Sequence, residues 1–577
     1  MDKYYLGIFG ARGPNPAAAL LKNNKLIALA EEERFIRIKN APSYLPINSI
    51  KYCLKQAKIK LSKVKAIGFA WKCPQYKKNV VKKNKDEPRN DNKISNYYNE
   101  IYNKKLSLDF DDVIIKENLK FLLKKIGENF DDKKLKFLEH HKCHAASAFY
   151  CSGFKKASIL IMDGSGEDIC TSFWKGNQNK LEKLEEFKLP HSLGGFYSSF
   201  TEFLGFKSDS EEGKLMGLAP YGSYSKDLQK KINKVLSIDY NSEKYSINSK
   251  YRFHGKRSQN IKFTDNFCKI FGNPRLKNEK LTKYHRDLAF NVQFKLEEVS
   301  LFLAKKLIKK TKIKNLCIAG GVGMNCKMNG QLSLMKEVDN IFIQPASSDN
   351  GTSLGAAQIV AVNDGVKNFN SLSHAYYGPE FNNKEILKAI KETKLKYEFK
   401  KNISTFAAKE IFSGKIIGWF QGRAEFGARS LGGRSILANP LIKNMKNKIN
   451  LEVKHRENWR PFCPSILSDD FKKFFDTKDK CEFMILAKKI KKEFRNKLSS
   501  VVHRDGSARP QCVYKETNNR YYSLLKEFKR KSGYPILLNT SFNIQGEPIV
   551  NSPIEAIRCF SGTGIDTLII GNYVLSK

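Results

Sequence analysis

The chain has 577 residues, of which 41% are hydrophobic and 12% aromatic. That length exceeds what one hydrophobic core usually organises, so we expect at least two domains. The composition excludes global disorder, because it can bury enough apolar surface to fold. The formal net charge is +45, from 103 basic and 58 acidic residues. An anionic partner would explain this excess, but we favour a general lysine-rich composition because the lysines are spread along the chain.

No segment marks the chain for export or for a membrane. The start, MDKYYLGIFG, lacks an apolar core followed by a small-residue cleavage site, so we expect no signal peptide. No run of 18 or more apolar residues occurs, which predicts no membrane span. The 12 cysteines form no CxxC pair and are typical of reduced thiols. These features predict a cytoplasmic protein.

Short apolar runs and helical spacing alternate along the chain, which is typical of an α/β protein. The predicted strands are 4–9, 17–22, 26–31, 64–70, 136–138, 157–164, 315–321, 340–343, 415–420 and 535–538. The predicted helices are 111–125, one starting near His140, and 287–310.

Three polar stretches interrupt this pattern. Residues 72–105 are rich in Lys, Asn, Asp and Tyr, and we interpret them as an exposed insertion rather than a nucleic-acid arm. Residues 223–262 are a second candidate insertion. Residues 362–380 are polar and punctuated by Gly and Pro, which favours a domain boundary there. We therefore expect domains at 1–365 and 372–577.

Two histidines and two aspartates form a candidate metal site. His140 and His144 would lie one turn apart on one helix face. Asp163 follows an apolar run and is expected at a strand end, where α/β proteins keep ligands. Asp349 lies at a turn from a strand into a helix, although either aspartate could instead be a turn or cap residue. Two imidazoles with two carboxylates suit Fe²⁺, Mn²⁺ or Zn²⁺ better than Mg²⁺.

Two glycine-punctuated segments lie in the first predicted domain. Gly320, Gly321, Gly323 and Asn325 occupy a turn from a strand into a helix, where glycine lets the backbone approach a phosphate. Tight packing alone would also explain these glycines. The segment 212–222 contains Lys214, which is either a buried functional lysine or a surface residue in a simple turn.

Arginine is concentrated in loops of the second predicted domain. Gly-rich residues 421–434 include Arg423, Arg429 and Arg434. Further candidate phosphate-binding residues in this domain are Lys454, Arg456, Arg460 and Arg509. The planar guanidinium matches phosphate oxygens, and a general bias toward Lys does not explain Arg. We therefore favour a phosphate site here over structural ion pairs.

Taken together, these motifs resemble the carbamoyltransferases of the NodU/CmcH type, which modify nodulation factors and antibiotics. The matching segments run in family order along almost the whole chain. They are AEEERF (30–35), HHKCHAASAF (140–149), MDGSGED (162–168), EGKLMGLAPYG (212–222), GGVGMNCKMNG (320–330), SSDNGTSLGAA (347–357), GRAEFGARSLGGRSILANP (422–440), RENWRPFCPS (456–465), DGSAR (505–509) and LNTSFNIQGEPIV (538–550).

The resemblance implies an actin/Hsp70-like (TsaD-like) N-terminal domain and a YrdC-like C-terminal domain. The second would join carbamoyl phosphate to ATP, with Mg²⁺, giving carbamoyl-adenylate and pyrophosphate. The first would transfer the carbamoyl group to a hydroxyl of a small molecule or glycan, using Fe²⁺ or another divalent transition metal. The implied metal ligands are His140, His144, Asp163 and Asp349. The implied catalytic residues are Arg429, Lys454, Arg460, Arg509 and Lys214. The implied nucleotide-binding residues are Gly320, Gly321, Gly323, Asn325, Arg423, Arg456, Ser541 and Asn543.

Three positions depart from the family pattern. Pro14 and Asn15 stand where members usually carry a His-Asp pair, and Gln545 stands where a basic residue is frequent. Two other functions stay open on the sequence: a tRNA threonylcarbamoyl-adenosine enzyme with the same folds, and a non-catalytic nucleotide- or polymer-binding derivative. We expect no nucleic-acid partner and leave a homodimer open.

Overall fold

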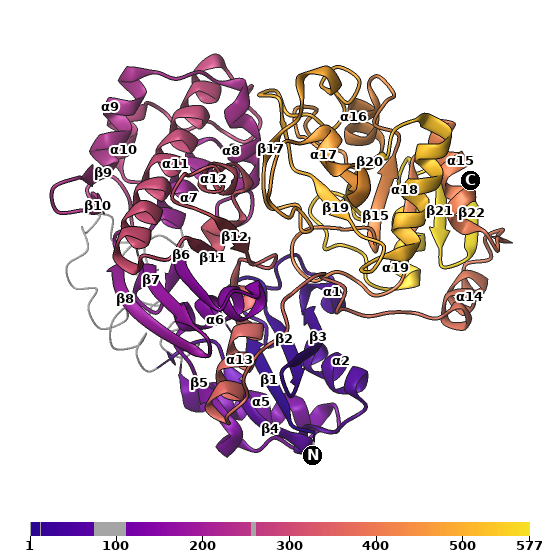
Figure 1. Ribbon diagram of the computed structural model, residues 1–577, viewed down its shortest axis with the longest axis horizontal. Coiled ribbons are helices and arrows are strands. Elements are labelled where there is room, and N and C mark those ends of the chain that lie inside the picture. Colours follow the sequence, from indigo (N-terminus) through magenta and orange to yellow (C-terminus); the bar gives the residue numbers. More distant parts are fainter. Residues whose placement is uncertain (1, 12, 74–110, 255–260) are drawn as a thin grey trace. The chain divides into compact units, whose positions relative to one another are not determined.

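The computed structural model describes residues 2–11, 13–73, 111–254 and 261–577 (Figure 1). Most of the expected insertion at 72–105 therefore lies outside the described residues. All 12 cysteines are free thiols. Within the described ranges, no helix combines the length and the apolar character needed to cross a bilayer.

The chain divides into two compact units. The first consists of residues 1–32 and 40–371, and the second of residues 33–39 and 372–577. The short segment 33–39, which includes helix α1 (Glu33–Ile36), thus belongs with the C-terminal part of the chain.

The first unit contains two five-stranded sheets with the same topology. In each sheet three consecutive strands pair antiparallel, and two later strands add in parallel beside the first strand. The first sheet has the order β3 (Lys25–Glu31), β2 (Ala17–Lys22), β1 (Tyr4–Phe9), β4 (Val64–Phe69), β5 (Leu135–Phe137). The second has the order β8 (Lys180–Lys188), β7 (Ile169–Asn177), β6 (Lys156–Gly166), β11 (Asn315–Ala319), β12 (Asn340–Ile343). The strands predicted in this region are confirmed.

Two buried helices connect the two sheets. Helix α13 (Thr352–Asn363) packs on β1 and β4, α6 (His140–Ser152) packs on β6 and β11, and the two helices pack on each other. Glycine is needed for these approaches: a Cβ at Gly7 would lie 1.8 Å from the carbonyl oxygen of Ser353, and one at Gly355 would lie 1.8 Å from that of Cys143. Close packing here fixes the N-terminal ends of both helices.

Further helices complete the first unit, and those predicted at 111–125 and 287–310 are confirmed as α5 and α11. The helices are α2 (Ile47–Ala57), α5 (Asp112–Lys125), α7 (Leu193–Phe203), α8 (Glu212–Leu218), α9 (Lys226–Val235), α10 (Asp265–Phe271), α11 (Lys283–Thr311) and α12 (Cys326–Leu332). The candidate insertion at 223–262 contains α9 and a hairpin of β9 (Leu236–Asp239) and β10 (Lys244–Ile247).

The second unit is built on one mixed eight-stranded sheet. Its order is β13 (Glu398–Phe399), β22 (Tyr573–Ser576), β21 (Thr567–Ile570), β14 (Ile417–Phe420), β15 (Arg434–Ala438), β20 (Ile536–Ser541), β16 (Cys463–Leu467), β19 (Gln511–Val513). Helices α15 (Ile403–Phe412) and α18 (Asn519–Ser532) pack together, and α19 (Pro553–Ser561) packs on α14 (Asn383–Glu392), β14 and β21. A two-stranded ribbon of β17 (Lys488–Lys489) and β18 (Ser507–Ala508) stands apart from this sheet.

Both units are therefore mixed α/β structures, as the sequence predicts.

Candidate functional site

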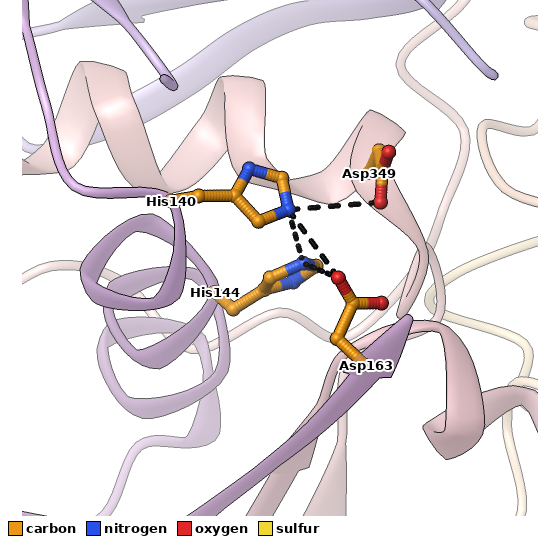
Figure 2. Close-up of side chains that lie close together, drawn as sticks. All are labelled: His140, His144, Asp163 and Asp349. Carbon is orange, nitrogen blue, oxygen red and sulfur yellow. Dashed lines mark hydrogen bonds and ion pairs between the residues drawn. The ribbon is translucent and has the colours of Figure 1, made fainter. Parts of the chain in front are cut away.

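Four side chains from separate parts of the first unit converge on one point (Figure 2). One ligand atom from each of His140, His144, Asp163 and Asp349 lies within 4.8 Å of the others. The two histidine Nε2 atoms are 3.1 Å apart. His140 Nε2 is 3.6 Å from Asp163 Oδ2 and 3.7 Å from Asp349 Oδ1, and His144 Nε2 is 4.0 Å from Asp163 Oδ2. We call these four residues the His/Asp tetrad.

His140 is held through both its ring and its backbone. Its Nδ1 lies 2.9 Å from the carbonyl oxygen of Ala70. Because a carbonyl can only accept, Nδ1 carries a hydrogen, and Nε2 is the ring nitrogen that faces the tetrad. The backbone N–H of His140, at the start of α6, donates to the carboxylate of buried Glu167 at 3.2 Å. A second partner on Nδ1 is the arrangement that metal-binding histidines show.

The Gly-rich loop after β11 orients Asp163. The N–H of Gly321 donates to Oδ1 of Asp163 at 2.7 Å, which leaves Oδ2 for the histidines. The prediction that Asp163 lies at a strand end is wrong, because β6 continues to Gly166. Its regular pairing with β7 is nevertheless interrupted between Met162 and Gly166. That irregularity, rather than a strand terminus, presents the carboxylate.

The electrostatics of the tetrad favour a cation. Burial opposes protonation of His140, but Asp163 and Asp349 raise its pKa well above the ordinary value. Burial and the charge of His140 lower the pKa of His144. Burial raises the pKa of Asp349, whereas His140 and His144 hold that of Asp163 below its ordinary value despite its burial. Two carboxylates thus face one imidazolium, and a divalent ion would replace the shared proton.

The donor set therefore fits a transition metal. Two imidazole nitrogens and two carboxylate oxygens in a buried cluster are the ligands that Fe²⁺, Mn²⁺ and Zn²⁺ share. A hard ion such as Mg²⁺ would prefer oxygen ligands alone.

The loop with the departing residues Pro14 and Asn15 lies beside the tetrad. A Cβ at Gly13 would lie 3.3 Å from Oδ2 of Asp349. The side-chain nitrogen Nδ2 of Asn15 lies 3.4 Å from the hydroxyl oxygen of Ser348, the residue that precedes Asp349. The loop in which the resemblance implies a His-Asp pair thus adjoins the candidate metal site.

Other residues predicted in the first unit have structural contacts. A Cβ at Gly320 would lie 2.2 Å from the carbonyl oxygen of Met162, and one at Gly323 would lie 2.3 Å from Ser347 Oγ, so both glycines permit tight packing. Asn325 caps α12 and pairs with Gln293. Lys214 is buried and pairs with Glu211 at 2.8 Å. Their assignment to nucleotide binding or catalysis remains a prediction.

A second group of predicted residues gathers in the second unit. We call Lys454, Arg456, Arg460 and Arg509 the basic cluster. Arg456 donates to Asn450 Oδ1 at 2.7 Å and stacks over Phe462, with its Cζ 4.8 Å from the ring centroid. Arg509 directs Nε and Nη2 at Cys463 Sγ, 3.2 and 3.0 Å away. Stacking and hydrogen bonding hold both guanidinium groups in defined orientations.

Lys454 connects the basic cluster to the loop after β20. Its ammonium donates to the carbonyl oxygen of Asn543 at 2.8 Å, to the Asn543 side-chain oxygen at 3.0 Å and to the carbonyl oxygen of Ser541. The predicted nucleotide-binding residues Ser541 and Asn543 therefore contact a member of the cluster. The three N–H groups of Lys454 serve this loop, so its charge rather than a direct bond is what it can offer an anion.

The positive charges of the basic cluster lower the pKa values of neighbouring members. Burial, then Arg456 and Arg460, hold the pKa of Lys454 well below its ordinary value. Burial, then Arg460 and also Arg509, lower the pKa of Arg456 to about 9. Mutual repulsion among partly buried cations is relieved when an anion binds. The cluster is therefore suited to phosphate groups.

Three arginines of the segment 421–434 have different environments. Arg434 is fully buried and donates to the carbonyl oxygens of Gln421, Gly422 and Pro379, so it is structural. Arg423 donates to the carbonyl oxygens of Tyr377 and Gly378. Arg429 is half-buried. Roles for Arg423 and Arg429 in nucleotide binding remain predictions.

Each half of the chain matches a model of a known protein family. Residues 7–358 match the family model described as carbamoyltransferase N-terminus, and residues 408–577 match the one described as carbamoyltransferase C-terminus. The chain belongs to the carbamoyltransferase family. It is therefore an enzyme of the transferase class, and the resemblance noted from its motifs is confirmed.

Alignments with three relatives span most of this carbamoyltransferase. Nodulation protein NolNO of Sinorhizobium fredii is 33% identical, over 97% of this chain and 78% of that protein. Nodulation protein NolO of Bradyrhizobium diazoefficiens is 35% identical, over 76% of this chain and 79% of that protein. An uncharacterized Synechocystis protein is 37% identical, over 97% of this chain and 95% of that protein.

Proposed function

We propose that this carbamoyltransferase is an ATP-dependent O-carbamoyltransferase with a separate chemical step in each unit. The second unit forms carbamoyl-adenylate from carbamoyl phosphate and ATP. The first unit transfers the carbamoyl group to a hydroxyl of a sugar-like acceptor. The observation that carries the proposal is the convergence of the His/Asp tetrad from distant parts of the chain, within 4.8 Å.

The basic cluster supports the first step. Carbamoyl phosphate, ATP and one water molecule give carbamoyl-adenylate, pyrophosphate and orthophosphate. Charge develops on phosphate oxygens, and the arginines of the cluster are held where they would stabilise such charge. Arg460 is suited to direct contact, because its side chain is 28% exposed and therefore accessible to a small anion.

The tetrad supports the second step. The acceptor oxygen attacks the carbamoyl carbon, the bond from that carbon to the adenylate oxygen breaks, and AMP leaves while the hydroxyl proton is released. A bound Fe²⁺ or similar ion would act as a Lewis acid toward the carbamoyl and phosphate oxygens. Ala70 and Gly321 keep His140 and Asp163 oriented toward one point, so the chain contributes preorganised ligands.

The architecture is consistent with the folds that the motifs imply. Two sheets of identical topology in one unit are what an actin/Hsp70-like, TsaD-like domain would contain, and we propose that fold for residues 1–365. For residues 372–577 we propose a YrdC-like fold built on the mixed eight-stranded sheet.

The test uses the purified full-length chain. We expect pyrophosphate release with ATP and carbamoyl phosphate, and none with ATP, threonine and bicarbonate. In a second arm, labelled carbamoyl phosphate is added with an extract of the source cells, and mass spectrometry should find a carbamoylated hydroxyl compound. Pyrophosphate release only in the presence of threonine would instead identify a threonylcarbamoyl-transferring enzyme.

A further inference from the structure

The segment 33–39 contacts both loops that carry proposed anion-binding residues of the second unit. It follows β3 directly in sequence, yet it belongs to the second unit. Arg34 is 4% exposed and Arg37 is half-buried. Neither arginine is explained by the first unit's fold or by the proposed chemistry.

Arg34 holds the first of these loops. Its Nη2 donates to the carbonyl oxygen of Gly427 at 2.9 Å. Gly427 has a φ of +88°, a conformation that favours glycine, and it precedes Arg429 by two residues. The same loop is fixed from within by Glu425, whose carboxylate accepts the N–H groups of Leu431 and Gly433, both at 2.6 Å. The bond from Arg34 is thus placed where it sets the backbone next to Arg429.

Arg37 holds the second loop. Its Nη1 donates to the carbonyl oxygen of Ile549 at 2.7 Å and its Nη2 to that of Pro548 at 2.8 Å. Nη1 also lies 3.1 Å from Glu555. The loop is closed by the N–H of Val550, which donates to Phe542 at 2.9 Å. A planar guanidinium that bonds two adjacent carbonyls restrains the loop in both position and orientation.

The second loop is held from two sides, and a hydrogen bond across the loop connects these sides. Ser541 and Asn543 contact Lys454 on one side, and Arg37 holds Pro548 and Ile549 on the other. The side chain of Asn543 also donates to the carbonyl oxygen of Glu547 at 2.7 Å, across the loop. The charges of Lys454 and Arg37 both act on the pKa of Cys559, which burial raises to about 11.

We propose that Arg34 and Arg37 are positioning residues of the carbamoyl-adenylate site: the segment 33–39, contributed by the N-terminal part of the chain, sets the two loops that carry the site's anion-binding groups. This inference rests on the proposed function. It means that the adenylate-forming site is not encoded within residues 372–577 alone.

The test compares full-length variants by pyrophosphate release with ATP and carbamoyl phosphate, and by amide hydrogen exchange. In Arg37→Ala we expect kcat/KM for carbamoyl phosphate to fall about tenfold or more, mainly through KM, because the loop loses its restraint. Amides of residues 543–550 should exchange faster while those of the first unit do not. Arg37→Lys should recover part of the loss, since an ammonium can reach a carbonyl but lacks the planar fork.

Arg558→Ala is the matched control. Arg558 approaches the same loop from solvent, 3.5 Å from Glu547, with its side chain 65% exposed. We expect its kinetics and exchange to match the wild type. A wild-type kcat/KM in Arg37→Ala, or an equal loss in Arg558→Ala, overturns the proposal. If the wild type itself releases no pyrophosphate, the proposed function fails, and unchanged exchange at 543–550 in Arg37→Ala would then separately overturn the positioning role.

Discussion

The backbone N–H of Gly321 donates to one carboxylate oxygen of Asp163 at 2.7 Å, while the other oxygen lies 3.6 Å from Nε2 of His140. A loop that looks like a phosphate-binding turn therefore also orients a candidate metal ligand. The relationship links the two motifs of the first unit and orients one carboxylate ligand before any ion binds.

The proposed separation of activation and transfer into two sites predicts variants that lose one activity and keep the other. His144→Ala should stop labelled carbamoyl transfer to the acceptor but leave pyrophosphate release within about twofold of the wild type, because the basic cluster is untouched. His141→Asn is the control, since His141 lies in the same helix but bonds Ser172 at 2.8 Å and is not part of the tetrad. Loss of pyrophosphate release in His144→Ala would argue against the division.

The reciprocal prediction concerns Arg460. Arg460→Ala should reduce pyrophosphate release by about a hundredfold or more, because the proposed phosphate site would lose one of its charged groups. Its metal content should equal that of the wild type. Arg530→Ala serves as the control, because Arg530 lies in α18, is 68% exposed and pairs with Glu527 one turn away at 3.1 Å. Equal pyrophosphate release by wild type and Arg460→Ala would contradict the assignment.

Metal binding should release a proton from the tetrad. In the metal-free protein the pKa of His140 is raised well above its ordinary value, so the ring is protonated near neutral pH. An ion must displace that proton, and its affinity should rise about tenfold per pH unit until pH passes the folded pKa of His140, then level off. Calorimetric titration of metal-free protein with Mn²⁺ in two buffers of different ionisation enthalpy measures the proton count. A heat independent of buffer would refute the coupling.

Packing between α6 and α13 predicts a large loss of stability. In Gly355→Ala the new methyl group would lie 1.8 Å from the carbonyl oxygen of Cys143, which is backbone and cannot rotate away. We expect a destabilisation of about 3 kcal/mol or more and reduced metal retention, because α6 begins with His140 and α13 begins three residues after Asp349. Gly213→Ala, with open space around the added group, should change stability by less than about 1 kcal/mol. Equal melting temperatures for the two variants would contradict this account of the helix contact.

Sequence patterns located the tetrad residues because each ligand follows a readable signal. His140 and His144 have helical spacing, Asp163 follows an apolar run, and Asp349 lies at a turn from a predicted strand into a helix. The groups that orient these ligands were not predictable, since the carbonyl of Ala70 and the N–H of Gly321 are backbone atoms with no side-chain signature.

The arginines show a second limit of the sequence. Arg423, Arg429 and Arg434 share one Gly-rich segment, yet Arg434 serves backbone carbonyls in the interior. Local sequence cannot distinguish an arginine that binds a ligand from one that satisfies buried carbonyls, because both uses need the same fork of donors. The sequence also did not predict that residues 33–39 belong to the second unit. That membership depends on contacts with residues far along the chain: Arg34 with Gly427, 393 positions away, and Arg37 with Ile549, 512 positions away.

Metal analysis of the purified chain tests the central claim most directly. Anaerobically purified wild type, compared with Asp163→Ala and His140→Ala, should contain about one equivalent of iron or another divalent transition metal per chain, and each variant should lose it. A wild type without bound ion after supplementation with Fe²⁺, Mn²⁺ or Zn²⁺, or variants that retain the full equivalent, would contradict the claim that these four residues hold a metal.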